Sequence, residues 1–204
     1  MPPHHDRPTL LAPRHHAVPA ATGTLGLWLF LASLAMLFAG SMLAYLLIRT
    51  VPEDAPPLGE AELPGGLWLS TAIIVASSFT LHAALQKLRR ERQVAFRRLL
   101  LVTCVLALAF LVVQAPSLAA LLAEHRVHLA DDRLAQPAGL IFFLILVHAA
   151  HVVGGIVHMG IVTVQAHRHR YDHEHYRPVQ HLAMYWHFLD IVWLVMFTTF
   201  LVAG

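Results

Sequence analysis

The residues of this chain whose side chains are best suited to chemistry are a few histidines and one aspartate that lie within long apolar stretches. His187 and Asp190 are three residues apart in an apolar run from about 181 to 203, which is long enough to cross a bilayer as a helix. His148 and His151 have the same spacing in another apolar run. A carboxylate near the middle of a membrane costs roughly 2.5–3.5 kcal/mol on insertion. Asp190 therefore requires a partner, a proton or a position that faces protein.

Helical spacing limits what these residues can do together. Residues three or four apart share a helical face, so His187 is predicted beside Asp190, and His148, His151 and His158 are predicted to form one stripe. Histidines at this spacing with a carboxylate fit three kinds of site: a metal site, a proton relay, or a polar network that ties helices together.

The neighbouring residues favour the network. Gly154 and Gly155 would let another helix approach closely, and Trp186 and Trp193 share a large aromatic face. We therefore interpret four residues as a helix-packing polar network: His148, His151, His187 and Asp190. In this interpretation the chain has no catalytic, cofactor-binding or metal-binding residue.

The composition is that of an integral membrane protein. Of the 204 residues, 57% are hydrophobic and 13% are charged, whereas about 25% are charged in an average soluble domain. The net charge of +2 is small, and the basic residues cluster in short loops, which predicts no nucleic-acid partner. The prediction is an all-α membrane bundle without a separate soluble domain.

Five transmembrane helices are predicted in a membrane domain that covers residues 23–204. The apolar runs lie at about 24–48, 67–86, 99–122, 139–164 and 181–203. Residues 1–22 are rich in His and Pro, and we expect a flexible tail there. Pro116 lies inside the third run, where it should kink the helix or end its regular hydrogen bonding.

The distribution of charge predicts the orientation. Residues 87–98 contain six Lys and Arg, whereas residues 50–66 contain four acidic residues and no Lys or Arg. Because Lys and Arg favour cytoplasmic loops, the N-terminus is predicted inside and the C-terminus outside.

Several strings resemble a known family, subunit III of the haem-copper respiratory oxidases in its short five-helix form. The string Tyr185–Trp193 (YWHFLDIVW) resembles the Trp-His-Phe-x-Asp-x-Val-Trp signature of the family's last helix, and 148–155 (HAAHVVGG) resembles its His-Gly-x-His-Val-x-x-Gly string. Residues 26–31 and 67–71 resemble its first two helices. The resemblance covers about residues 23–204.

The resemblance implies a function without a redox centre in this chain. The family's subunit III carries no haem or copper, packs beside the catalytic subunit and holds lipids. The resemblance thus implies a non-catalytic accessory subunit in the bacterial cytoplasmic (inner) membrane, with haem and copper in the partner subunit. The implied partners are catalytic subunit I, subunit II and membrane lipids. Three departures weaken any role in proton uptake: Leu34 in place of a carboxylate, Ala149 in place of a glycine, and residues 114–116 (QAP) without the Trp or Glu expected shortly after them.

Two alternatives belong to other functional classes. An accessory subunit of a nitric oxide reductase would share the same helix bundle. A membrane di-iron hydroxylase would account for the sixteen histidines. Such a hydroxylase needs several histidine boxes at one membrane face, whereas many of these histidines lie in the tail and the polar loops.

Overall fold

The computed structural model describes residues 20–50, 65–128, 135–171 and 176–203, and there the chain forms five α-helices. All five contain a stretch long and apolar enough to cross a membrane. The predicted all-α architecture of five membrane helices is confirmed. The helices are α1 (Ala20–Thr50), α2 (Gly65–Arg89), α3 (Gln93–His128), α4 (Ala135–His167) and α5 (Arg177–Ala203).

The helices extend beyond the apolar runs that predicted them. Pro116, where a kink or an end to regular hydrogen bonding was predicted, does not end the helix, because α3 continues through it to His128. Residues 123–128 and 135–138, predicted as loop, are helical. Both segments contain alanine and other good helix formers, so the helix persists past the apolar stretch. Most of the predicted tail lies outside the described residues, and its last three residues belong to α1.

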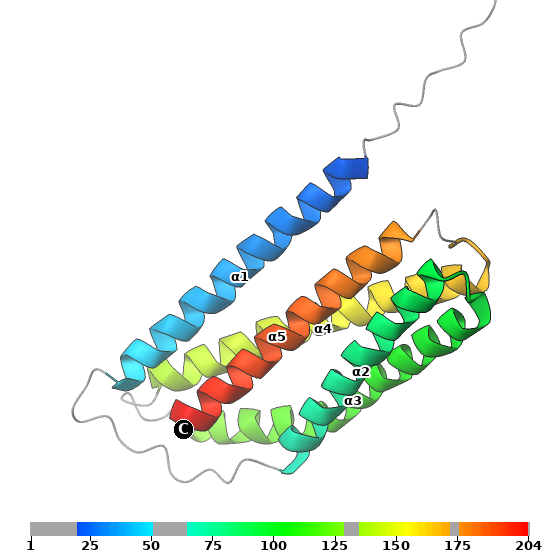
Figure 1. Ribbon diagram of the computed structural model, residues 1–204. Coiled ribbons are helices and arrows are strands. Elements are labelled where there is room, and N and C mark those ends of the chain that lie inside the picture. The colour runs from blue at the N-terminus through cyan, green and yellow to red at the C-terminus, as the bar shows by residue number, and fades with distance from the viewer. Residues whose placement is uncertain (1–19, 51–64, 129–134, 172–175, 204) are drawn as a thin grey trace, which may run out of the picture.

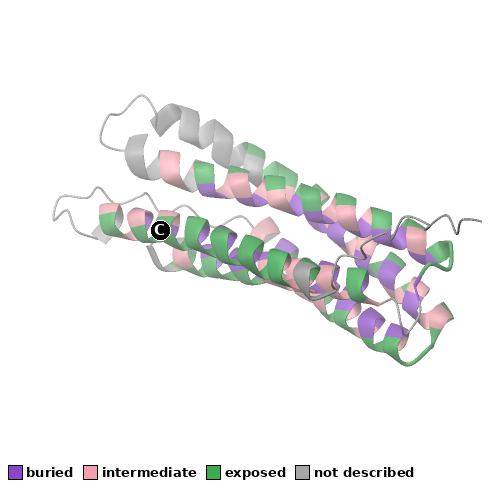
Figure 2. Ribbon diagram, turned by 90° about the horizontal axis from the view of Figure 1, so that it is seen from above, coloured by how far each residue is buried: buried purple, intermediate pink, exposed green. Residues whose placement is uncertain are grey.

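Helix α5 occupies the centre of the arrangement. It contacts α1, α2 and α4, whereas α1 contacts only α4 and α5. Figure 1 shows α1 on one side of α5, with α2 and α3 on the other. Half of the most apolar window of α5 is buried inside the protein, against 22–33% in the other four helices. Figure 2 shows that buried residues face inward between the helices while the outer surfaces are exposed.

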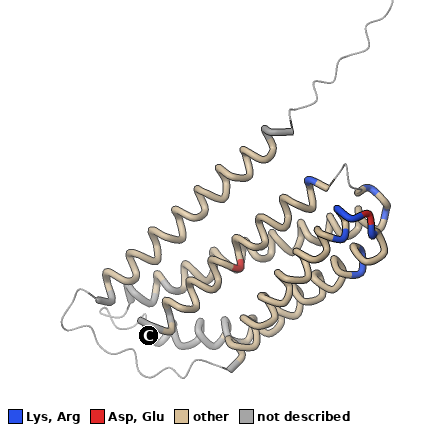
Figure 3. Tube along the Cα trace, viewed as in Figure 1, with Lys and Arg blue, Asp and Glu red and all other residues tan. Residues whose placement is uncertain are grey.

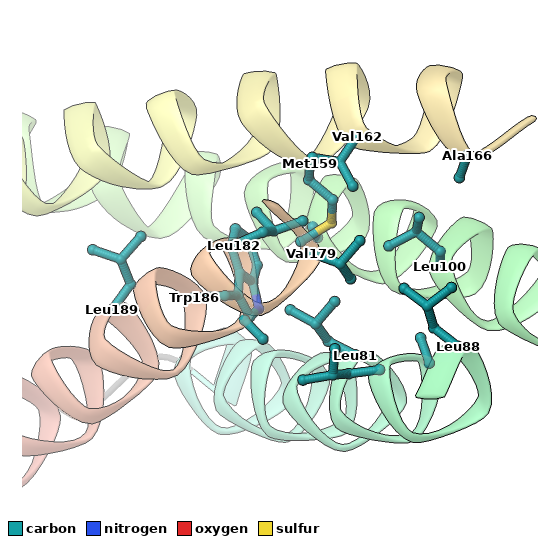
Figure 4. Close-up of a cluster of buried hydrophobic side chains, with 14 of the residues drawn as sticks. Leu81, Leu88, Leu100, Met159, Val162, Ala166, Val179, Leu182, Trp186 and Leu189 are labelled. Atoms are coloured by element: carbon teal, nitrogen blue, oxygen red, sulfur yellow. The ribbon is translucent and has the colours of Figure 1, made fainter. Parts of the chain in front are cut away.

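Two apolar clusters hold the helices together. The larger one joins α2, α3, α4 and α5, and Figure 4 shows Trp186 and Leu182 of α5 among side chains of the other three helices. The smaller one attaches α1 to α4 and α5 and contains Leu34, Phe38, Met42, Leu144, Val192 and Met196. Helix α1 therefore has a core of its own, separate from that of α2 and α3.

Among the residues that the structure describes, Lys and Arg gather at one end of the bundle, around the α2–α3 turn and the two ends of the segment between α4 and α5 (Figure 3). Nη2 of Arg97 lies 2.7 Å from Nδ1 of His169, and the Gln93 amide donates to the carbonyl oxygen of Tyr171 at 3.2 Å. These bonds join the two turns. The hydroxyl of Thr24 lies 3.1 Å from Nε2 of His181, so the start of α1 is at this end too. Helix α5 ends at the opposite end of the bundle (Figure 1).

Candidate functional site

The tryptophans of the α5 signature bond this helix to α2. Trp186 is completely buried, and its indole N–H donates to Oγ of Ser77 at 3.0 Å. The indole N–H of Trp193 donates to Oγ1 of Thr71 at 3.1 Å. Because the two tryptophans share a helical face, they fix α5 against α2 at two depths.

Asp190 lies at the edge between α5 and α2, deep in the membrane span. At about 1.5 Å per residue it is about 20 Å from Arg177 at the basic end of α5. Its residue is 5% exposed, and within the described part of the chain neither carboxylate oxygen has a hydrogen-bond partner. Nδ1 of His187 lies 3.9 Å from Oδ2. Nδ1 of His187 is 2.5 Å from Oγ of Ser78, so the three side chains form an Asp–His–Ser arrangement across the two helices.

His148 and His151 lie on the side of the bundle that faces α1. The His148 ring is 3% exposed, stacks on Trp193 with centroids 5.6 Å apart and meets the edge of Phe38 at 6.1 Å. His151 contacts the same phenylalanine at 6.2 Å, and its Nδ1 is 2.7 Å from the carbonyl oxygen of Val147 in its own helix.

The four residues predicted as one polar network therefore lie in two groups. No hydrogen bond or ion pair links His148 or His151 to Asp190 or His187 in the segments that the structure describes. The first group is packed among aromatic rings, and the second lies at the edge between α2 and α5.

Gly155 determines how closely α4 approaches α5. A Cβ atom at this position would lie 3.1 Å from Cζ3 of Trp186 and 3.2 Å from Cε1 of Tyr185, closer than side chains normally pack. The Tyr185 hydroxyl donates to the carbonyl oxygen of His151 at 2.9 Å, one turn before this contact. Gly154 is less constrained, because its Cβ would be 4.0 Å from the Tyr185 hydroxyl.

The partners on α2 were not identified from the sequence. Ser77, Ser78 and Thr71 supply the oxygens that α5 meets, although hydroxyls in membrane helices often bond only their own backbone. The spacing of six to seven residues from Thr71 to the two serines matches the spacing of Trp186 and Trp193 on the antiparallel helix. This match in spacing could have pointed to the α2 partners from the sequence.

The described residues do not assemble a metal site. No group of three or more His, Cys, Asp or Glu side chains within the described residues is placed to hold one ion. The chemistry available at the α2–α5 edge is hydrogen bonding and proton exchange between Asp190, His187 and Ser78. The histidine pairs of the N-terminal tail lie outside the described residues.

Comparison with known proteins agrees with the family resemblance found in the sequence. The family model for cytochrome c oxidase subunit III matches residues 9–204. The chain is 28% identical to cytochrome c oxidase subunit 3 of Thermostichus vulcanus, over 85% of this chain and 84% of that relative. It is 26% identical to the cytochrome bo(3) ubiquinol oxidase subunit 3 of Pseudomonas putida, over 88% of this chain and 85% of the relative. With a match over nearly its whole length, the chain belongs to the cytochrome c oxidase subunit III family.

Proposed function

We propose that this chain is a non-catalytic subunit of a haem-copper terminal oxidase and that it packs beside the catalytic subunit in the membrane. The proposal rests on the contacts that the α5 signature residues make in a chain of this family. Its tryptophans bond to α2, and Trp186 and Tyr185 pack against Gly155 of α4. These residues build a rigid membrane scaffold rather than converge on a substrate.

The reaction of the complex belongs to the partner subunits. Haem and copper would lie in catalytic subunit I and its partner subunit II, and electrons would pass there to dioxygen. The relatives include a cytochrome c oxidase subunit and a ubiquinol oxidase subunit, so both electron donors are represented among them. These names favour a terminal oxidase over a nitric oxide reductase.

We place the basic end of the bundle at the cytoplasmic face of a bacterial cytoplasmic membrane. The turns that carry most of the described Lys and Arg lie at this end, and such residues favour the cytoplasmic side. The N-terminus would then be inside and the C-terminus outside.

Membrane lipids are the second class of partner that we propose. Helices α1 and α2 do not contact each other, and both expose large apolar side chains, including Phe30 and Leu69. Acyl chains would cover these surfaces and support the attachment of α1. The expected consequences for the oxidase are more complete assembly and a longer lifetime during turnover.

Purification through a tag on this chain in mild detergent tests the proposal. We expect a haem-containing partner to copurify, with the absorption spectrum of a haem-copper oxidase. A colourless chain purified alone would overturn the proposed function. The variant Asp190→Leu should lose catalytic subunit, or shorten the turnover lifetime in oxygen-consumption assays, before it slows electron transfer.

The matched control is Thr198→Leu on the same helix. The Thr198 hydroxyl is exposed and donates to the carbonyl oxygen of Leu194 at 2.7 Å, so it needs no partner from another helix. Asp190→Leu complexes with full subunit content and a normal lifetime would contradict the structural role of Asp190.

A further inference from the structure

We propose that one edge of the bundle is the surface on which a transmembrane helix of the catalytic subunit docks, and that this helix donates a hydrogen bond to Nε2 of His187. The inference rests on the proposed function and adds to it the face and the chemistry of the contact. We call this surface the polar edge, and it consists of Ser78, His82 and Gln86 of α2 with His187 and Asp190 of α5.

The polar edge is open to the membrane at a depth where polar groups are costly. The His187 side chain is 34% exposed and lies about 15 Å along the span from Arg177. His82 and Gln86 are exposed and continue the strip toward the basic end, with 3.0 Å between Nε2 of each residue. The His82 ring lies 6.1 Å from the His187 ring. An imidazole that faces acyl chains leaves its polar atoms unsatisfied, which favours a protein cover.

Two exposed hydroxyls elsewhere in the described spans bond within their own helices. The hydroxyls of Ser33 and Thr199 each donate to a backbone carbonyl oxygen four residues earlier, at 3.0 and 2.8 Å. The outer faces of α3 and α4 expose apolar residues such as Val112 and Val157. Those faces fit lipid, whereas the polar edge needs hydrogen-bonding partners.

The arrangement around His187 defines what the partner must supply. The Asp190 carboxyl and the Ser78 hydroxyl both lie on the Nδ1 side of the ring, at 3.9 and 2.5 Å. In the tautomer with its proton on Nδ1, the ring donates to Oγ of Ser78 and points its N–H toward the Asp190 carboxyl group, which leaves a lone pair on Nε2. Nε2 has no partner in the segments that the structure describes. The docking helix would therefore present a donor, such as a hydroxyl or an amide N–H.

Asp190 acts through His187 rather than by direct contact. Both of its oxygens are inaccessible in this chain, so a docking helix reaches the ring and not the carboxyl group. Asp190 is thus a positioning residue that orients the ring and sets its tautomer. Around the ring, Phe79 (72% exposed) and Ile191 (60% exposed) offer apolar surface for the body of the docking helix.

Site-specific photo-cross-linking in the assembled oxidase tests where the catalytic subunit lies. A photoreactive phenylalanine analogue replaces Phe79 or Leu194 beside the polar edge, or Val112 or Val157 on the outer faces of α3 and α4. All four positions are exposed, so the fold should be retained. We expect positions 79 and 194 to capture a transmembrane peptide of the catalytic subunit, and positions 112 and 157 to capture none.

The outcomes separate this inference from the proposed function. If the oxidase copurifies intact but the catalytic subunit is captured only from positions 112 or 157, or from none of the four, the docking surface is wrong and the proposed function stands. If no catalytic subunit copurifies with the unmodified chain, both fail.

Substitution of His187 tests the chemistry of the contact. His187→Gln keeps an acceptor and should retain the catalytic subunit within about twofold of the unmodified chain, whereas His187→Phe should retain at least about fivefold less. Ser33→Ala on α1 is the control and should change nothing. Equal retention by His187→Phe and His187→Gln, at equal amounts of chain in the membrane, would overturn the proposed hydrogen bond. If the Phe variant fails to accumulate, loss of the catalytic subunit from the Gln variant would overturn it instead.

Discussion

The two sides of α5 are attached to the rest of the bundle by different interactions. Toward α2, Trp186 and Trp193 donate hydrogen bonds to hydroxyls at two depths. Toward α1, the contacts inside the membrane are apolar, with Val192 and Met196 packed against Phe38 and its neighbours. The side-chain hydrogen bond between α1 and α5 in the described segments lies near the basic end, between Thr24 and His181.

This difference matters because lipid is as apolar as the side chains themselves. Membrane helices associate through close packing and hydrogen bonds rather than through the hydrophobic effect. The α2 side has both close packing and hydrogen bonds, so the position of α5 along α2 is fixed by the geometry of the bonds as well as by the fit of the side chains. The described contacts between α5 and α1 inside the membrane are packing contacts, so we expect this side to be the weaker attachment of α5. The predictions below test this contrast.

The largest effect is expected from Trp186→Ala. The substitution leaves a cavity in the main core and removes the donor that Ser77 accepts, which should lower the free energy of unfolding by about 3–5 kcal/mol. Val192→Ala on the α1 side removes fewer atoms and no hydrogen bond, so it should cost less. Unfolding of the purified chain in micelles by sodium dodecyl sulfate measures both. Equal midpoints would remove the contrast between the two sides.

The next effect is expected from Gly155→Leu. A side chain here meets the rings of Trp186 and Tyr185, and overpacking of this kind costs about 1–3 kcal/mol. Gly160→Leu is the control on the same helix, because no atom lies within 4 Å of the Cβ that would be added there. Thermal loss of this subunit from the purified complex should start at a lower temperature for position 155 only. A matching loss from the Gly160 variant would show that α4 tolerates no added bulk on either face.

A smaller effect is expected from Thr71→Val, which preserves shape and removes the acceptor of the Trp193 indole N–H. Interhelical hydrogen bonds in membranes contribute about 0.6 kcal/mol on average and up to about 1.7 kcal/mol. Thr71→Ser keeps the hydroxyl and should behave like the unmodified chain in the same detergent titration. If the serine variant loses as much stability as the valine variant, packing and not the bond holds this contact.

The sequence predicted what lies within one helix better than what lies between helices. Five apolar runs gave the five spans, and a separation of three residues placed His187 beside Asp190, because both features are local. The helix ends were predicted less well, because an apolar run marks the membrane span and not the full length of the helix. Helix α3, for example, continues past Pro116.

Contacts across helices depended on rotations that no single span reveals. Spacing within one span does not show which way each helix faces its neighbours. In the structure His148 faces Phe38 and Trp193, and Asp190 lies toward Ser78. Which α2 hydroxyls accept hydrogen bonds from α5 depends on that rotation, so they could be identified only in the assembled bundle.

The smallest effect is expected from Thr24→Val, which removes the hydrogen bond between α1 and α5 at the basic end. Because this end lies near the membrane surface, water can replace the lost partner of His181, and the cost should stay below about 0.6 kcal/mol, the average for a bond inside the membrane. Thr24→Ser is the control, and both are measured by the titration used for Thr71. A cost equal to that of Thr71→Val would mean that a hydrogen bond fixes α1 as firmly as α2. The two sides of α5 would then differ only in how deep in the membrane their hydrogen bonds lie.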